Sequence, residues 1–174
     1  MASKIKIRKT NKDDISSMEL LYKKAFPDEE LFPLIIELFD DKQNVTSICA
    51  FINSHLVGHV ALSKCYVSSK KYPLALLGPL AVMPEYQRQG IGSSLIRHGF
   101  DSLKSNGFLK LLVLGDPNFY KSFGFEVETK IQPAYPIPKE WETAWQSFTL
   151  SEGGEEPEGT LEVPNAWQKQ ELWS

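Results

Sequence analysis

Residues 87–93 combine residue types and a spacing that suit the binding of a diphosphate. The run reads Gln-Arg-Gln-Gly-Ile-Gly-Ser and separates an apolar segment from a segment with helical spacing. Backbone N–H groups in the first turn of a helix lack internal partners and face the positive end of the helix dipole, so they can receive an anion. The two glycines leave room for the phosphates, and Gln87, Arg88 and Ser93 can add side-chain donors. We therefore predict that this run is a diphosphate cradle.

Two other phosphate-binding motifs do not fit the run. A Walker-type loop ends in Gly-Lys-Ser or Gly-Lys-Thr, and a dinucleotide fingerprint needs a third glycine and a later acidic residue that binds ribose. Residues 87–93 contain neither a lysine nor a third glycine. A nucleotide therefore stays open as the ligand but is disfavoured.

A buried strand and an amphipathic helix flank the run and must position it. Residues 72–83 are nearly all apolar, which predicts a strand covered on both faces, and a Gly-Pro pair within it should break the hydrogen-bond ladder. Residues 90–106 carry an apolar stripe at helical spacing, and Gly107 follows as a left-handed helix stop. The cradle should thus lie where the strand ends and the helix begins.

Other elements are predicted along the whole chain. Residues 108–114 should form a second buried strand, after which Asp116 can cap a short helix with Pro117 at its first position. Further strands are expected at residues 4–8, 45–52, 59–67, 125–131 and 145–150, helices at 13–25 and 29–40, and a hairpin partner at 160–163. The four tryptophans near the C-terminus, Trp141, Trp145, Trp167 and Trp173, could form an acceptor wall or seal the end of the sheet, and sealing is favoured.

Length and charge limit the classes of protein that fit this sequence. A chain of 174 residues that is 42% hydrophobic predicts one domain over residues 1–174. A net charge of −3 provides no overall cationic field for a nucleic acid or an anionic membrane. No signal core or membrane-spanning run is evident, so we expect a cytoplasmic protein. Cys49 and Cys65 lie in apolar surroundings without metal-ligand or redox spacing, which predicts buried free thiols and no metal site.

Two segments resemble motifs of the GNAT N-acetyltransferases. Residues 80–92, Leu-Ala-Val-Met-Pro-Glu-Tyr-Gln-Arg-Gln-Gly-Ile-Gly, resemble the coenzyme A loop of that superfamily. Residues 113–125, Val-Leu-Gly-Asp-Pro-Asn-Phe-Tyr-Lys-Ser-Phe-Gly-Phe, are similar to its late tyrosine-helix-Gly-Phe motif, particularly in the YhbS-like branch. Glycine pairs at a helix start also arise from close packing, but the two motifs together favour the family. The resemblance spans residues 4–130 and leaves 131–174 as a C-terminal extension.

The resemblance implies an α/β fold with a mixed, splayed central sheet flanked by helices. It implies that the strands at 72–83 and 108–114 run parallel and then separate, with acetyl-CoA as cosubstrate in the opening. The pantetheine arm is expected to hydrogen-bond to the main chain of the first strand. The implied cofactor-binding residues are Leu80, Ala81, Val82, Gln87, Arg88, Gln89, Gly90, Ile91, Gly92 and Ser93.

The resemblance also implies the catalytic groups. Tyr120 is the expected proton donor to the coenzyme A sulfur, and the backbone N–H of Leu80 is the expected oxyanion donor. The alternative for Tyr120 is a core aromatic residue. The general base is open, because residues 74–82 carry no titratable side chain, and His59 or an ordered water could serve.

The predicted function is direct transfer of an acetyl group from acetyl-CoA to a primary amine, on a small molecule or a protein. The alternative is a catalytically inactive acyl-CoA sensor or partner-binding module, which the missing strand base favours. Acetyl rather than a longer acyl group follows from the resemblance alone. A homodimer stays open.

Overall fold

The computed structural model describes residues 4–68, 73–152 and 156–174 of the chain. In this part the strands are hydrogen-bonded in the order β1-β2-β3-β4-β5-β8-β6, with a separate pair β7-β9. Parallel and antiparallel pairs both occur in the larger sheet, so the fold is a mixed α/β fold, as predicted. The chain groups into two compact units, Met1–Leu62 with Pro79–Asp101 and Ser63–Gly78 with Ser102–Ser174. A single domain stays a prediction.

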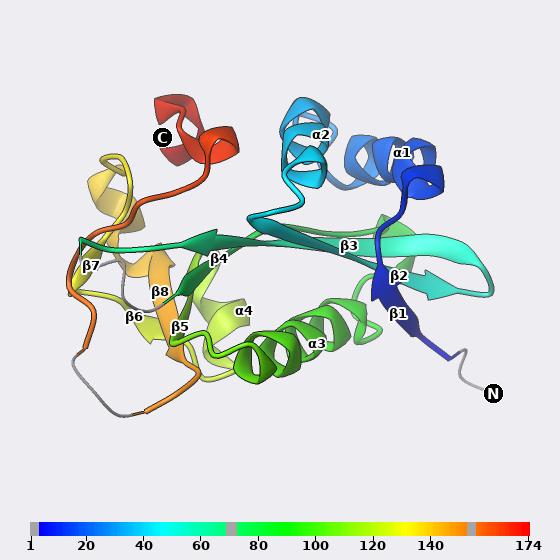
Figure 1. Cartoon of the computed structure of the whole chain (residues 1–174). Coiled ribbons are helices and arrows are strands. Elements are labelled where there is room, and N and C mark those ends of the chain that lie inside the picture. The colour runs from blue at the N-terminus through cyan, green and yellow to red at the C-terminus, as the bar shows by residue number, and fades with distance from the viewer. Residues whose placement is uncertain (1–3, 69–72, 153–155) are drawn as a thin grey trace. The chain divides into compact units, whose positions relative to one another are not determined.

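The first unit holds the elements around the predicted cradle. Figure 1 shows α1 and α2 on one face of β2 and β3, and α3 on the other face. The elements of this unit are β1 (Lys6–Lys9), η1 (Lys12–Asp14), α1 (Ile15–Ala25), α2 (Phe32–Asp40), β2 (Val45–Ile52), most of β3 (His55–Cys65), the end of β4 (Leu74–Val82), η2 (Pro84–Tyr86) and most of α3 (Ile91–Ser105).

Local sequence signals explain the helices of the first unit. Asn11 caps η1 through a capping box with Asp14, which leads directly into α1. The apolar stripe of α1 buries Met18, Leu21 and Tyr22. The helix predicted from residue 29 begins three residues later, at Phe32, because residues 27–29 form a turn and a bend.

The second unit continues the strands and adds the C-terminal extension. Its elements are the start of β4, β5 (Lys110–Leu114), α4 (Pro117–Lys121), β6 (Glu126–Val127), β7 (Ile131–Gln132), η3 (Lys139–Ala144), β8 (Trp145–Thr149), β9 (Gly159–Thr160), η4 (Asn165–Trp167) and η5 (Gln170–Trp173). β8 lies between β5 and β6 and runs antiparallel to both.

The ladder between β4 and β5 ends before β4 does. The two strands pair in parallel from Leu74 with Lys110 to Leu77 with Val113, whereas β4 continues to Val82. The Gly-Pro pair therefore coincides with the end of this ladder, although the strand itself is continuous. Gly78 has φ +146°, and a Cβ built on it would lie 3.9 Å from the ring of Trp167. Tyr72, the predicted first residue of this strand, lies outside the described residues.

The predicted hairpin at residues 160–163 is wrong. β9 pairs in parallel with β7, and Glu162 exchanges two backbone hydrogen bonds with Tyr66, of 3.1 and 2.7 Å. β8 could not accept this segment, because β5 and β6 already pair with its two edges. Asn53 and Ser54, both at positive φ, form the turn after β2, and β3 begins at His55, before the strand start predicted at residue 59.

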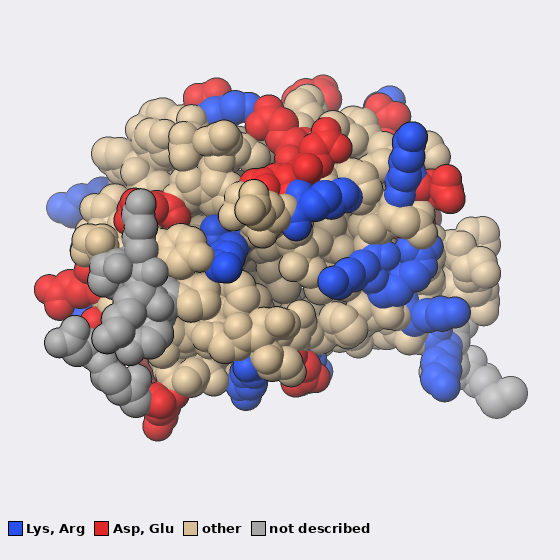
Figure 2. Space-filling model, in the orientation of Figure 1, with Lys and Arg blue, Asp and Glu red and all other residues tan. Residues whose placement is uncertain are grey.

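The surface carries charge in local groups. Figure 2 shows Lys and Arg side chains gathered around the region where Figure 1 places β1, a strand at the edge of the sheet. Lysines on an edge strand discourage pairing with another chain. Among the described residues, no helix combines the length and the apolar character that crossing a membrane requires. Both cysteines are buried free thiols, as predicted.

Three of the four tryptophans pack into the core of the second unit. The rings of Trp145 and Trp167 lie 5.9 and 6.0 Å from that of Trp173, measured between centroids. The ring N–H of Trp145 donates to the carbonyl of Ile131, and that of Trp167 donates to the hydroxyl of Ser63. The ring N–H of Trp173 donates to the carbonyl of Trp167. These three rings are therefore core residues, whereas Trp141 is 37% exposed.

The cluster makes a stability prediction with a control in the same segment. Trp173 is 1% exposed, so Trp173→Ala should lower the free energy of unfolding by about 3–5 kcal/mol in urea titrations. Trp141 is 37% exposed, so Trp141→Ala should cost less than about 1 kcal/mol. Equal losses in the two variants would show that the C-terminal extension does not share the core.

Candidate active site

The predicted cradle is a tight loop between β4 and α3. After η2, the backbone adopts positive φ at Arg88 (+63°) and at Gly90 (+85°), and α3 then begins at Ile91. Positive φ is uncommon for residues other than glycine. The first helical hydrogen bond, 3.0 Å long, runs from the N–H of Ser94 to the carbonyl of Gly90. The loop therefore delivers its backbone directly into the first turn of the helix.

The backbone N–H groups of residues 88–93 have no protein acceptor within the described residues 4–68, 73–152 and 156–174. These residues are exposed or half-buried except Ile91, so an anion can reach the loop. Successive N–H groups near residues of positive φ form anion-binding concavities, and the helix dipole adds to the attraction. The chemistry of this donor set fits a diphosphate.

Two glutamine side chains brace the loop. Gln87 donates from Nε2 to the carbonyl of Val82, at 3.1 Å, and so ties the loop to the end of β4. Gln89 donates from Nε2 to the carbonyl of Glu85, at 3.2 Å. The structure thus brings the predicted residues Gln87 and Val82 together, with the Gln87 amide holding the protein backbone. Arg88 is exposed at the loop.

A glycine of β3 sets how closely the strand approaches α3. A Cβ built on Gly58 would lie 2.9 Å from Cγ2 of Ile91 and 3.1 Å from Cδ1 of Leu95. Ile91, the first residue of α3, is 1% exposed and packs in this space. Sequence reasoning missed Gly58 as a positioning residue, although a glycine inside a strand is a signal of close approach.

Tyr120 lies in the second unit on α4, which Asp116 caps as predicted. The carboxylate of Asp116 accepts from the N–H of Asn118 at 3.0 Å. The Tyr120 ring makes edge contacts with Phe119 and Phe125, with centroids 5.0 and 5.4 Å apart. A Cβ on Gly115 would lie 2.5 Å from Cε2 of Tyr120, so this glycine makes room for the ring.

The hydroxyl of Tyr120, unlike its ring, has no partner among the described residues. The residue is 7% exposed, and the hydroxyl has no hydrogen-bond partner within the described part of the chain. Every fully buried side-chain polar atom in that part has a partner, so the hydroxyl must retain contact with solvent. Burial, assisted by the charge of Asp116, raises the pKa of Tyr120 well above its usual value. The phenol is therefore protonated at neutral pH.

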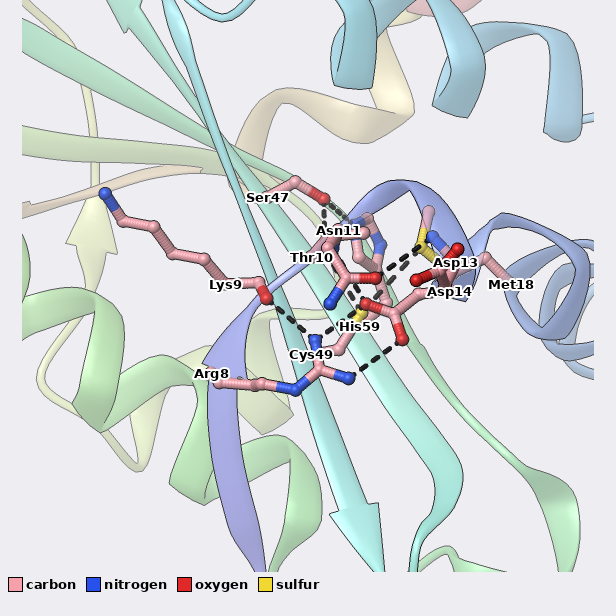
Figure 3. A network of polar contacts seen from close by, with 10 residues as sticks. All are labelled: Arg8, Lys9, Thr10, Asn11, Asp13, Asp14, Met18, Ser47, Cys49 and His59. Atoms are coloured by element: carbon pink, nitrogen blue, oxygen red, sulfur yellow. Dashed lines mark hydrogen bonds and ion pairs between the residues drawn. The ribbon is translucent and has the colours of Figure 1, made fainter.

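His59, the open candidate for the general base, is enclosed in a polar network below α1. Figure 3 shows it among residues of β1, η1 and β2. Its Nδ1 bonds with the hydroxyl of Tyr22 at 2.6 Å, and its Nε2 bonds with the hydroxyl of Ser47 at 2.7 Å. Ser47 bonds in turn with Thr10, at 2.7 Å. Both ring nitrogens are occupied, so His59 has no free lone pair for a substrate amine.

Comparison with known proteins identifies the family. The model of the acetyltransferase (GNAT) family matches residues 15–125. The chain is 34% identical over 149 residues to an uncharacterized N-acetyltransferase of Escherichia coli K12, YjhQ, covering 82% of each chain. It is 30% identical over 115 residues to the E. coli K12 uncharacterized N-acetyltransferase YhbS, covering 66% of this chain and 69% of that one.

Solved structures agree in fold. The crystal structure of E. coli YhbS in complex with CoA superposes with a TM-score of 0.85 at 26% identity, covering 97% of this chain and 94% of that one. A Brucella melitensis GNAT acetyltransferase in complex with acetyl-CoA gives a TM-score of 0.77 at 24% identity, covering 96% and 100%. The chain therefore belongs to the GNAT acetyltransferase family, whose members are acetyl-CoA-dependent acyltransferases.

The buried histidine predicts a pH dependence of stability. Burial lowers the pKa of His59 from 6.5 to about 3, so between these values the unfolded chain binds a proton that the folded chain does not. Stability is then full above about pH 6.5 and falls as the pH drops, by about 2 kcal/mol at pH 5. Urea titrations at pH 8 and pH 5 should show this loss.

Two variants test whether His59 causes this pH dependence of stability. His59→Gln should lose most of the pH dependence between 8 and 5, whatever its effect on stability at pH 8. His98 is exposed on α3, so His98→Gln should keep it. A His59→Gln protein with the wild-type pH dependence would contradict the assignment.

Proposed function

We propose that this chain transfers the acetyl group of acetyl-CoA directly to a primary amine of a small molecule or a protein. Membership of the GNAT family supports this, as do the relatives YjhQ and YhbS, both named N-acetyltransferases, and the CoA and acetyl-CoA in the two structural neighbours. The single observation that carries it is the row of N–H groups at residues 88–93 without protein acceptors in the described part of the chain. A diphosphate is the ligand that such a row suits best.

The cosubstrate would be held by the loop and by the end of β4. In this proposal Arg88, Gln89, Gly90, Ile91, Gly92 and Ser93 bind the diphosphate, and Gln87 braces their loop against Val82. The main chain of Leu80, Ala81 and Val82 binds the pantetheine arm, which is consistent with a β4–β5 ladder that ends at Leu77. The fully buried side chains of Leu74 and Ala75 hold the strand in place.

Two groups would carry the chemistry. The amine nitrogen forms a bond to the acetyl carbon, and the bond from that carbon to sulfur breaks. The N–H of Leu80 stabilises the oxyanion of the tetrahedral intermediate, and the hydroxyl of Tyr120 gives its proton to the departing thiolate. The raised pKa of Tyr120 keeps this proton in place at neutral pH. Because both nitrogens of His59 are bonded, an ordered water accepts the proton of the amine.

A non-catalytic acyl-CoA sensor would share the cradle but not the turnover. Release of free thiol from acetyl-CoA in the presence of amines separates the two. Binding of acetyl-CoA without thiol release across a broad panel of amines would favour the sensor.

The first prediction of this proposal concerns Gly90. An alanine at φ +85° is strained by about 1 kcal/mol, so Gly90→Ala should distort the loop and weaken acetyl-CoA binding by about tenfold or more in calorimetry. Gly107→Ala is the matched control, because Gly107 also has positive φ, +76°, and open space around a Cβ. Both variants should lose similar stability. Equal acetyl-CoA affinities in the two would argue against the cradle.

The second prediction concerns Tyr120. Tyr120→Phe keeps the ring among its aromatic neighbours and removes the proton, so kcat should fall by about 100-fold or more while the affinity for acetyl-CoA and the stability change little. Tyr66→Phe is the matched control, because Tyr66 is a half-buried tyrosine outside the predicted site, and it should leave kcat unchanged. A Tyr120→Phe enzyme within about twofold of wild-type kcat would rule out the acid role.

A further inference from the structure

The second unit contains a cavity of about 590 Å³, and none of the predicted cofactor-binding or catalytic residues lines it. This volume is within the range of small-molecule sites. The cavity has an apolar wall contributed by the loop before η3 and by β8, namely Tyr135, Pro136, Ile137 and Trp145. The N–H of Trp145 already donates to the carbonyl of Ile131, at 2.7 Å, so this ring offers only carbon to a ligand. The wall suits an apolar body of modest size.

Two opposite charges stand at the same cavity. Lys139 and Glu142 both line it and both are exposed. They are three residues apart in η3, and in a 3₁₀-helix such residues lie on the same face. Within the described ranges neither side chain has an ion pair or a hydrogen bond to another residue. One cation and one anion are thus presented together and left for a ligand.

A third charged residue at the cavity does not change this balance. Glu128 accepts from Nζ of Lys110 at 3.1 Å and from the hydroxyl of Ser147 at 2.6 Å. It also accepts from the N–H groups of Lys130 and Ile131, at 2.8 and 3.0 Å. These bonds outweigh burial and keep the pKa of Glu128 below its usual value. Its charge is already neutralised by Lys110, so the charges left for a ligand are those of Lys139 and Glu142.

The helix η3, which lines the cavity, is hydrogen-bonded within the same unit to the segment that carries Tyr120. The carbonyl of Ala144, the last residue of η3, accepts from the N–H of Gly115 at 3.0 Å, and Gln146 donates to the carbonyl of Gly115 at 3.2 Å. The Tyr120 ring occupies the space beside Gly115 that a Cβ would need. The helix that carries both charges therefore ends beside the residue that positions the tyrosine.

We infer that this cavity binds a small zwitterion with an apolar body, such as a free apolar α-amino acid, and that this ligand is the amine acceptor. The α-carboxylate pairs with Lys139, the α-ammonium with Glu142, and the side chain lies on the apolar wall. The role as acceptor rests on the proposed function. The nitrogen forms a bond to the acetyl carbon as the bond to sulfur breaks. Of the two protons that the ammonium loses, one ends on the thiol and the other in solvent.

The binding part is tested on the full chain without acetyl-CoA. Calorimetry compares L-leucine with leucinamide, which lacks the carboxylate, and with 4-methylpentanoate, which lacks the amine. L-leucine should bind at least about tenfold more tightly than either, because each charged pair adds a charge-assisted hydrogen bond. No saturable binding of L-leucine, or equal affinities for the three, would overturn the inference.

Variants then assign each charge. Lys139→Met should abolish the preference for L-leucine over leucinamide and keep the preference over 4-methylpentanoate, and Glu142→Gln should do the reverse. Lys104→Met and Glu171→Gln, both at exposed residues outside the cavity, should keep both preferences. Each preference is a ratio of affinities for two ligands measured on the same variant. A general loss of stability would weaken binding of all three ligands and leave these ratios unchanged. Preferences that survive in Lys139→Met and Glu142→Gln would overturn the assignment.

Thiol release from acetyl-CoA tests the role as acceptor. L-leucine should support release in the wild type, and Lys139→Met should raise KM for L-leucine about tenfold with kcat little changed. Release with other amines but not with apolar amino acids would overturn this inference and leave the proposed function intact. An absence of release with every amine would count against the proposed function, while calorimetry would still decide whether the cavity binds a zwitterion.

Discussion

The account depends on the start of α3, where the N–H groups of residues 88–93 have no protein acceptor in the described part of the chain. The positive φ angles at Arg88 and Gly90 produce this arrangement by turning the loop into the first turn of the helix. Unpaired amides are costly unless water or a ligand satisfies them. Gly58, by letting β3 approach Ile91, and Gln87, by bonding to Val82, hold that arrangement in place. Packing and hydrogen bonds within the protein therefore keep this set of backbone N–H donors unpaired.

The second unit positions Tyr120, whose ring is buried and whose hydroxyl remains in contact with solvent. Gly115 provides the space for the ring, and Phe119 and Phe125 contact it edge to face. The same Gly115 is hydrogen-bonded to the end of η3, which carries Lys139 and Glu142. A backbone hydrogen bond from Gly115 to Ala144 thus joins the segment that carries the acid to the helix that carries the charges assigned to the acceptor. Trp145, which directly follows η3, packs against Trp173, and the N–H groups of both rings have acceptors.

Local signals made much of this predictable from the sequence. The apolar period located α1 and α3, the Asn-Gly stop ended α3, and the Asp-Pro pair marked the cap of α4. The family resemblance rested on the same local runs. Pairing between segments far apart in the chain was harder to predict from the sequence. β9 pairs with β7 because both edges of β8 are occupied, and the apolar spacing of residues 160–163 gives no sign of this. The burial of His59 and the cavity beside η3 also depend on segments far apart in the chain, so sequence reasoning left the first open and missed the second.

The most direct test of the central claim is to follow the backbone amides themselves. In ¹H–¹⁵N spectra of the labelled protein titrated with coenzyme A, the N–H signals of residues 88–93 should show the largest shifts, saturating together with binding. A titration with 3′-phosphoadenosine 5′-diphosphate, which keeps the diphosphate and lacks the pantetheine arm, should leave the signals of Leu80, Ala81 and Val82 nearly unmoved. Saturable binding of coenzyme A that moves other amides while those of residues 88–93 stay in place would contradict the account.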